Sequence, residues 1–327
     1  MSKARELASL GNAYSDGALS NRNLIINGAM QVAQRGTSFA SKGHTLDRWI
    51  LSSSATAPTV TQETGVFSLG GKSIKMAPDA TNTYAYVGQR IEDLSFFSGK
   101  TITVSFDYKS TQDFYVGFEY HYGVGGSATD YNQNEVLVPA AATATRAVVT
   151  VTVPDLSAKT FGPSNTSFLQ VFFNEVTNPS ILEMTNLQLE VGDTATPFEH
   201  RSIGQELALC QRYYQKSLPQ SVAPSDSYGA GVEGPLAAHS AHTAYATTMQ
   251  YPVVMRTYPT ITFYASAGTS GVAGKWAYYN GSWNVVDSIG ASAITDRWFT
   301  PSLTKMSGFT AQNVYLFSGN YALDAEL

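Results

Sequence analysis

The two carboxylates best suited to chemistry are Asp107 and Glu119, which stand in two segments of alternating apolar residues. Residues 101–108 and 114–122 carry apolar side chains at every second position, so each carboxylate points away from the apolar face of its strand. If the two strands are neighbours in one sheet, both carboxylates share a polar face. A glycosidase needs its two carboxylates about 5 Å or about 6.5–9.5 Å apart. Hydrolysis is therefore an open alternative, and we assign no catalytic residue.

Tyr115, Glu119 and His121 share the polar face of the second of these strands. Aromatic rings stack against the C–H faces of sugars, and carboxylate and imidazole groups form hydrogen bonds with hydroxyl groups. These three residues are therefore candidate glycan contacts. The alternative is an ordinary solvent-exposed face of a half-buried sheet, which needs no ligand.

A second candidate binding surface is an aromatic-rich hairpin in the C-terminal part of the chain. Trp276 and Tyr278 share one face of its first strand, and Trp283 lies in its second strand. Asn280-Gly281 between the strands is typical of a two-residue type I′ turn, because both residue types readily adopt positive φ. Trp and Tyr are enriched in binding hot spots, so Trp276, Tyr278 and Trp283 are candidate ligand contacts. The alternative is that one set of rings belongs to a core or a subunit interface.

One clear helix is predicted, over residues 201–217, between two regions of alternating sequence. Ser202 is a suitable N-cap, and apolar residues recur near helical spacing as far as Tyr213 and Tyr214. Cys210, the only cysteine, lies on the apolar side and is expected to be a small buried residue. We predict that Tyr213 and Tyr214 contact another copy of the chain in an oligomer.

The rest of the sequence predicts a mainly β protein. Charged residues make up only 14% of the chain, and short alternating segments are separated by Gly, Pro, Asn and Ser. No helical pattern lies between the first group of segments, which favours a jelly-roll β-sandwich over a parallel α/β sheet. The predicted parts are an N-terminal arm over 1–22, the jelly roll over 23–200, the linking helix over 201–217 and a second, β-sandwich-like domain over 218–327.

Charge and hydropathy argue against two classes of partner. The net charge is −5 and no basic stripe is present, so nucleic-acid binding is not expected. No apolar run reaches the roughly 18 residues that a membrane span needs, so membrane insertion is not expected either. The first residues lack the apolar centre of a signal peptide. We therefore expect the protein to be made and kept in a cytoplasm until it is released.

No metal or cofactor site is predicted from the residues. His239 and His242 are three residues apart, a spacing that converges on a helix but points to opposite faces of a strand. The sequence contains no phosphate loop, dinucleotide fingerprint, nucleophile elbow or Cys-x-x-Cys motif. We therefore expect a protein that is not an enzyme and uses no cofactor.

Three parts of the sequence resemble bacteriophage tail-fibre and related virion surface-fibre proteins. The run NLQLEVGDTATPFEHRSIGQELALCQRYYQK, residues 186–216, is similar to a junction in which a carbohydrate-binding-module-like jelly roll ends and a second β domain begins. Residues 23–36 and 45–49 are similar to the opening of such jelly rolls, and residues 319–327 to their C-terminal strand. The resembling stretches therefore lie at both ends and in the middle of the chain from Asn23 onward.

The resemblance implies a homotrimeric virion protein, assembled in the host cytoplasm, that adheres to a bacterial surface glycan during host attachment. Residues 1–22 would then anchor it to other virion proteins. The resemblance also implies a structural calcium ion, with Asp47 and Glu190 in matching regions. A capsid-decoration or head-fibre role, a polysaccharide depolymerase and a purely structural spacer are the alternatives.

Overall fold

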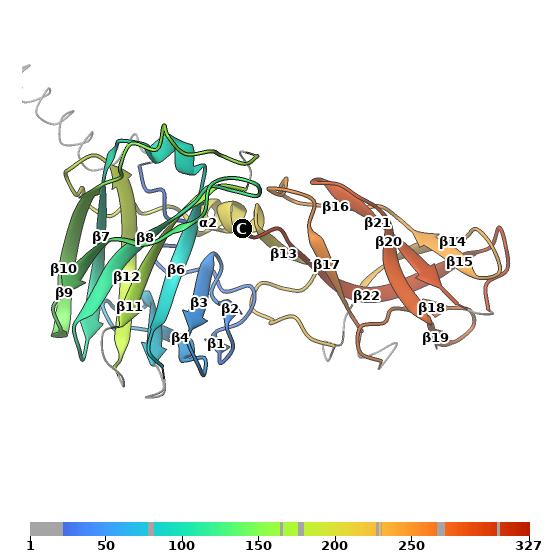
Figure 1. Ribbon diagram of the computed structural model, residues 1–327. Coiled ribbons are helices and arrows are strands. Elements are labelled where there is room, and N and C mark those ends of the chain that lie inside the picture. Colours follow the sequence, from blue (N-terminus) through green and yellow to red (C-terminus); the bar gives the residue numbers. More distant parts are fainter. Residues whose placement is uncertain are drawn as a thin grey trace, which may run out of the picture. The chain divides into compact units, whose positions relative to one another are not determined.

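The computed structural model describes residues 22–77, 82–163, 166–175, 180–226, 229, 231–266, 272–305 and 308–327. These residues form two compact units, the first coloured blue to yellow and the second mainly orange to red in Figure 1. The first unit contains Thr37–Glu206 with the preceding segment to Val32 and Leu327, and the second contains Leu207–Glu326 with Ala33–Gly36. The predicted anchoring arm lies outside the described residues except for Arg22.

The first unit is a jelly-roll β-sandwich of two six-stranded antiparallel sheets. Sheet A has the order β1 (Ser38–Phe39), β4 (Thr59–Thr64), β5 (Lys72–Ala77), β12 (Leu182–Val191), β7 (Thr101–Ser110), β10 (Ala141–Thr152). Sheet B has the order β2 (Gly43–His44), β3 (Trp49–Ser53), β6 (Ala85–Glu92), β11 (Phe168–Glu175), β8 (Phe114–His121), β9 (Asp130–Val138). Between β6 and β7 lies a short 3-10 helix, η1 (Leu94–Phe97). The chain thus crosses repeatedly from one sheet to the other, and β7 and β8 belong to different sheets.

The apolar faces of the two sheets meet in an aromatic core. Phe106 on β7 of sheet A meets Phe173 on β11 of sheet B edge-on, with ring centroids 5.1 Å apart. Trp49 on β3 lies 6.3 Å from the ring of Phe173. All three side chains are fully buried, and burying each contributes roughly 1.5–3 kcal/mol. This core fixes which face of each strand points inward, so the intervening polar residues line the two outer faces.

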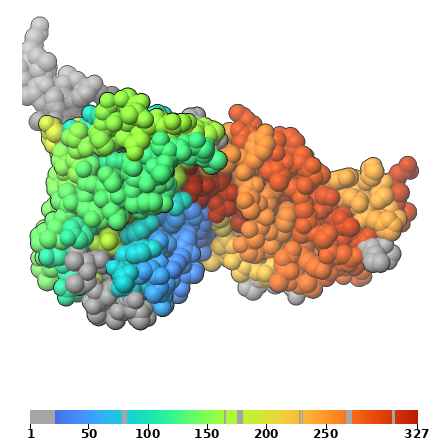
Figure 2. Space-filling model, viewed as in Figure 1, coloured from blue at the N-terminus to red at the C-terminus, as the bar shows by residue number. Residues whose placement is uncertain are grey.

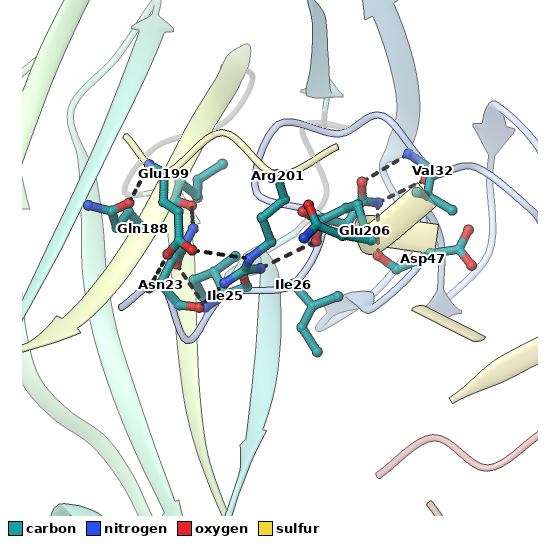
Figure 3. A network of polar contacts seen from close by, with 12 residues as sticks. Asn23, Ile25, Ile26, Val32, Asp47, Gln188, Glu199, Arg201 and Glu206 are labelled. Carbon is teal, nitrogen blue, oxygen red and sulfur yellow. Dashed lines mark hydrogen bonds and ion pairs between the residues drawn. The ribbon is translucent and has the colours of Figure 1, made fainter. Parts of the chain in front are cut away.

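A buried polar network holds the start of the first unit (Figure 3). Arg201 lies between two carboxylates, 3.7 Å from Glu199 and 3.6 Å from Glu206. Glu199 accepts a hydrogen bond from the backbone N–H of Asn23, and Glu206 accepts one from that of Asn27. These residues come from two of the stretches that resemble virion proteins. Their side chains thus connect these two stretches within the first unit.

Helix α2 (Ile203–Gln211) is shorter than predicted. Ser202 caps it as expected, because its Oγ accepts a hydrogen bond from the N–H of Gln205 at 3.3 Å and its own N–H donates to Gln205 Oε1 at 3.0 Å. The chain then enters β13 (Tyr214–Lys216), so Tyr214 is a strand residue and does not continue the helical face. Within the described residues, no helix is long and apolar enough to cross a membrane.

The second unit is one ten-stranded sheet. Besides β13, its strands are β14 (Val232–Ala238), β15 (Thr243–Ala246), β16 (Met249–Gln250), β17 (Thr260–Tyr264), β18 (Ala277–Tyr279), β19 (Trp283–Val285), β20 (Ser288–Ile294), β21 (Trp298–Thr304) and β22 (Val314–Asp324). The first part of β22, to Gly319, pairs with β14 and β18, and the part from Asn320 pairs with β13 and β17. Strand β22 is thus shared by two sets of strands, and the unit is β-rich as the sequence predicts.

Candidate functional site

A row of polar side chains crosses three strands on the outer face of sheet B. Glu119 on β8 is opposite Gln170 on β11, which is opposite Arg90 on β6. Because side chains alternate along each strand, residues two positions away lie on the same face. In the space-filling view, cyan residues around β6 and green residues around β8 and β9 form one continuous surface (Figure 2). The face also carries Tyr86, Tyr115, Gly117, His121, Phe168 and Phe172.

Hydrogen bonds in this row converge on Gln170, which is fully buried. Its Nε2 donates to Glu119 Oε2 at 3.0 Å and to Tyr86 Oη at 3.1 Å, and its Oε1 accepts from Arg90 Nε at 2.9 Å. His121 Nε2 lies 3.1 Å from the same oxygen of Glu119. Burial, followed by the nearby charge of Glu119, raises the pKa of Tyr86, which keeps this phenol neutral. Glu119 is thus fixed in position through Oε2, and within the described residues its Oε1 makes no hydrogen bond.

Aromatic rings flank His121, one of the two groups that hold the Glu119 carboxylate. The imidazole of His121 stacks on Phe168, with ring centroids 4.1 Å apart and 19° between the planes. Thr129 Oγ1 lies 3.2 Å from His121 Nδ1, so both imidazole nitrogens have partners. Tyr131 on β9 meets His121 edge-on at 6.0 Å and is 60% exposed. An exposed phenol ring beside the imidazole that holds a fixed carboxylate can bind a molecule that has both an apolar face and hydroxyl groups.

The shape of this face depends on Gly117, which is opposite Phe172 on β11. A Cβ atom on Gly117 would lie 2.4 Å from Cζ of Phe172, so only glycine leaves room for the ring at this place. The same ring lies 5.3 Å from that of Tyr86. Gly117 therefore allows the Phe172 ring to lie over β8 instead of being displaced from it.

Strand β9 supplies Tyr131 and is not predicted by the sequence. Its register with β8 shifts twice, and Asn132 and Asn134 have positive φ angles of 52° and 51°. Asparagine adopts this left-handed conformation more easily than most residues. The shifts interrupt the period-two pattern by which strands are recognised in a sequence. They also bring the Tyr131 ring next to His121.

The structure brings together three of the predicted contact residues, Tyr115, Glu119 and His121, on one face of β8. Tyr115 is half-buried and lies at the other end of the strand, opposite Asn174 of β11. Sequence reasoning missed the partners of Glu119 on neighbouring strands, because strand pairing is not visible in the sequence. One signal was present for Gln170, the only polar residue in the run from Phe168 to Phe173. The missed residues are Tyr86, Arg90, Phe168, Gln170 and Tyr131.

Asp107 and Glu119 do not form a carboxylate pair. Since β7 and β8 belong to different sheets, the two residues lie on opposite outer faces of the sandwich. Asp107 accepts hydrogen bonds from Arg146 Nη1 at 3.1 Å and from Asn186 Nδ2 at 2.7 Å. The condition for a catalytic pair, two neighbouring strands in one sheet, is therefore not met, and these residues cannot flank one glycosidic bond.

Two of the aromatic residues predicted for the second candidate surface are buried, so they cannot contact a ligand there. Trp276 is 0% exposed and Tyr278 is 2% exposed. The ring of Trp276 stacks on Phe317 with centroids 5.1 Å apart. It also fits against Gly319, where a Cβ atom would lie 2.0 Å from Cδ1 of the indole. Trp276 and Tyr278 thus belong to the core of the second unit, and the half-buried Trp283 is the one remaining candidate contact of this set.

The aromatic hairpin is present, but its turn differs from the predicted one. Strand β18 pairs with β19, with Tyr279 opposite Trp283, so Asn280, Gly281 and Ser282 form a three-residue turn. Gly281 has a positive φ of 85°, whereas Asn280 does not adopt a positive φ. A type I′ turn requires positive φ at both residues, and the predicted two-residue turn is therefore wrong.

Tyr213 and Tyr214, the predicted oligomer contacts, are 5% and 6% exposed in the single chain. The guanidinium of Arg35 lies 3.7 Å above the ring of Tyr214. Gln34 Nε2 donates a hydrogen bond to the carbonyl oxygen of Tyr214 at 2.8 Å. Both tyrosines thus pack within the second unit and offer little surface to another copy of the chain.

The residues suggested for calcium do not fit a calcium site. Glu190 Oε2 accepts hydrogen bonds from the Thr196 N–H at 3.0 Å and from Gln188 Nε2 at 2.8 Å, and its Oε1 accepts one from Thr196 Oγ1. Calcium requires about six to eight oxygen ligands, and these donors already occupy the oxygens of Glu190. Asp47 is buried elsewhere in the first unit. Among the residues that the structure describes, no group of three or more His, Cys, Asp and Glu is placed to hold a metal ion.

No family model matches the chain, and no curated protein matches it. The enzymatically active domain of tailspike protein 4 from bacteriophage CBA120 is 17% identical, with a TM-score of 0.37, over 52% of this chain and 21% of the tailspike chain. A proposed sugar binding protein from Bacteroides thetaiotaomicron is 12% identical, with a TM-score of 0.36, over 52% of this chain and 100% of its own. TmCBM61 in complex with beta-1,4-galactotriose is 13% identical, with a TM-score of 0.32, over 53% of this chain and 100% of its own.

Proposed function

We propose that the protein is a non-enzymatic surface-fibre protein of a bacteriophage virion, and that it adheres to a bacterial surface glycan through the outer face of sheet B. One observation carries the glycan-binding part: the Glu119 carboxylate is held by Gln170 and His121, and the exposed ring of Tyr131 meets that imidazole edge-on. The virion part rests on the resemblance of residues 186–216 to the junction of tail-fibre proteins.

The groups on this face suggest how a sugar would bind. The ring of Tyr131 offers a surface for the C–H face of a sugar ring. Glu119 Oε1 accepts a hydrogen bond from a hydroxyl group, because its hydrogen bonds to protein groups use Oε2. Since Gln170 and His121 already hold the carboxylate, little side-chain freedom is lost when the sugar binds. The bound sugar would therefore be oriented by one stacking contact and one fixed acceptor.

An array of bacterial surface glycans, probed with the full-length protein, tests this proposal. We expect Tyr131→Ala to weaken binding about tenfold or more, because truncating an aromatic hot spot costs on the order of 1–3 kcal/mol. Glu119→Gln should also weaken binding while it preserves the shape of the side chain. Tyr258→Ala is the matched control, because it removes another ring that is 67% exposed, and it should bind like the wild type.

Trp283→Ala tests the rival surface in the second unit. If this variant loses glycan binding while Tyr131→Ala and Glu119→Gln retain it, the contact lies on the aromatic hairpin and the sheet B proposal is wrong. Thermal unfolding of each variant must match that of the wild type for the comparison to hold. Release of glycan fragments by the wild-type protein would contradict the non-enzymatic part of the proposal and would favour a depolymerase.

A further inference from the structure

A pocket lies at the outer face of sheet A, on the opposite side of the sandwich from Glu119. Its volume is about 270 Å³, slightly below the usual range for pockets that hold drug-sized ligands. The walls come from the loop between β4 and β5, the middle of β12, the segment after Gly28, and His200. The lining residues are Ala29, Gln31, Phe67, Ser68, Leu69, Gly70, Gly71, Lys72, Thr185, Asn186 and His200.

The floor of the pocket is formed by an irregularity in β12. The register between β12 and β7 shifts after Thr185, and Asn186 has a positive φ of 51°. Asn186 Nδ2 donates to Asp107 at 2.7 Å, and the carbonyl oxygen of Asn186 accepts from Arg146 Nη1 at 3.1 Å. These contacts hold Asn186 in place and use its amide NH2 group, so its Oδ1 is available as an acceptor. The irregularity thus positions a rigid side-chain amide at the pocket.

The loop wall is also held in shape. Lys109 Nζ donates to the carbonyl oxygen of Val66 at 3.0 Å, and the N–H of Gly65 donates to the carbonyl oxygen of Gly71 at 2.9 Å. Gly70 has a positive φ of 74°, a conformation that favours glycine at this place in the turn. The loop presents the fully exposed side chain of Leu69 at the pocket. A ligand that covers Leu69 would remove apolar surface from water at the rim of a polar pocket.

The chemistry of the lining indicates the class of ligand. Within the described residues, neither the Gln31 amide nor the His200 imidazole forms a hydrogen bond, although His200 meets the ring of Phe198 edge-on at 4.9 Å. Amide and imidazole groups both donate and accept, as hydroxyl groups require. No carboxylate lines the pocket, so a cationic ligand would find no counter-charge. We propose that this pocket binds a single sugar ring that carries no positive charge.

This proposal concerns a different face from that of Glu119 and does not depend on the function proposed for sheet B. Saturation-transfer NMR on the full-length protein tests it, with methyl glycosides of glucose, galactose and mannose, glucuronate, and glucosamine as probes. We expect transfer to at least one neutral or acidic probe and none to glucosamine. Gln31→Ala and His200→Ala should each reduce the transfer several-fold, whereas His239→Ala, an exposed histidine in the second unit, should not.

The results separate the two sites. Tyr131→Ala should leave binding of these single sugars unchanged, because Tyr131 lies on sheet B. Absence of transfer to every neutral and acidic probe would overturn the pocket proposal, and so would transfer to glucosamine equal to that of the neutral probes. Transfer that persists in the Gln31→Ala, His200→Ala double variant would also overturn it, since the sugar would then bind elsewhere. Both side chains are exposed, so the variants are expected to fold.

Discussion

At the scale of single residues, the outer face of sheet B depends on Gly117, which has no side chain. Gly117 leaves room for the ring of Phe172, which in turn packs beside Tyr86. Tyr86 shares the Nε2 group of Gln170 with Glu119. A larger residue at position 117 would therefore displace the Phe172 ring and disturb Tyr86 and Gln170, which lie next to the Glu119 carboxylate.

We expect Gly117→Ala to lower the free energy of unfolding of the first unit by about 1–3 kcal/mol, the usual cost of overpacking a tight site. Glycan binding on sheet B should fall with it, because the displaced Phe172 ring disturbs Tyr86. Gly204→Ala is the control: a Cβ atom there would contact nothing within 4 Å and the residue is helical, so stability should be unchanged or slightly raised. Denaturant titration measures both variants, and equal stability of Gly117→Ala and wild type would refute the steric argument.

Asp130, the first residue of β9, should make the stability of the first unit depend on pH. Hydrogen bonds from Lys159, then from Tyr122, lower the pKa of its carboxyl group. A carboxyl group whose pKa is lower in the folded state stabilises the fold above its unfolded pKa, and this contribution is lost as the pH falls through the folded pKa.

Asp130→Asn should therefore lower the midpoint of denaturant unfolding at pH 7, and the difference from wild type should shrink steadily below about pH 4, the ordinary range for aspartate. Asp193→Asn, at an exposed position of the same unit, serves as the control. A difference between Asp130→Asn and wild type that stays constant from pH 7 to pH 2 would show that the charge of Asp130 is not what stabilises the fold.

At the scale of elements, the Arg201 network connects the first residues of the jelly roll with the start of helix α2. The side chains of Arg201, Glu199 and Glu206 are 8–12% exposed, so the two carboxylates depend on one buried cation. Arg201 also donates to the backbone carbonyl oxygens of Asn23 and Ile25. These contacts give a structural reason for the sequence of both stretches.

Arg201→Ala should destabilise the first unit by about 3–5 kcal/mol, because it leaves two buried carboxylates without a counter-charge. Lys42→Ala, which removes an exposed cation from the same unit, should change stability by less than about 0.5 kcal/mol. Differential scanning calorimetry measures both. A small effect of Arg201→Ala would mean that water replaces the guanidinium. The network would then not be what holds the two stretches together.

At the scale of the whole molecule, assembly remains a prediction from resemblance. The proposed virion role includes a homotrimer and an N-terminal arm, residues 1–22, that binds other virion proteins on the tail or on the head. Tyr213 and Tyr214 are buried within the second unit, so a trimer would have to use other surfaces.

Deletion of residues 1–22 should give a folded protein that no longer enters virions, because a short polar arm does not bury a core of its own. Light scattering on the full-length protein should report the mass of a trimer. Incorporation of the truncated protein at the normal copy number would rule out the anchoring role, and a monodisperse monomer at micromolar concentration would rule out the trimer. Cryo-electron microscopy of virions would then distinguish a tail fibre from a head fibre.

The sequence by itself determined the β class and the inward face of the main strands. In β7 and β8 the alternation of apolar residues places Phe106 and Phe118 in the core and Glu119 on the outside, as predicted. The N-cap at Ser202 was equally visible, and the structure adds its partner Gln205, three residues further along the chain. These features are local, and side-chain periodicity or a short spacing is enough to specify them.

Only the tertiary structure decided which residues meet. Alternation says which way a side chain points but not which strand lies beside it, so the sequence left open whether Asp107 and Glu119 share a sheet. Gln170 reaches Glu119 across 51 positions of the chain, a pairing fixed by the crossing of strands between sheets. The same holds for Trp276: the sequence placed it in a hairpin, but its burial depends on Gly319, a glycine on a distant strand that leaves space for the indole. Contacts of this kind arise from strand order and packing, which no short stretch of sequence encodes.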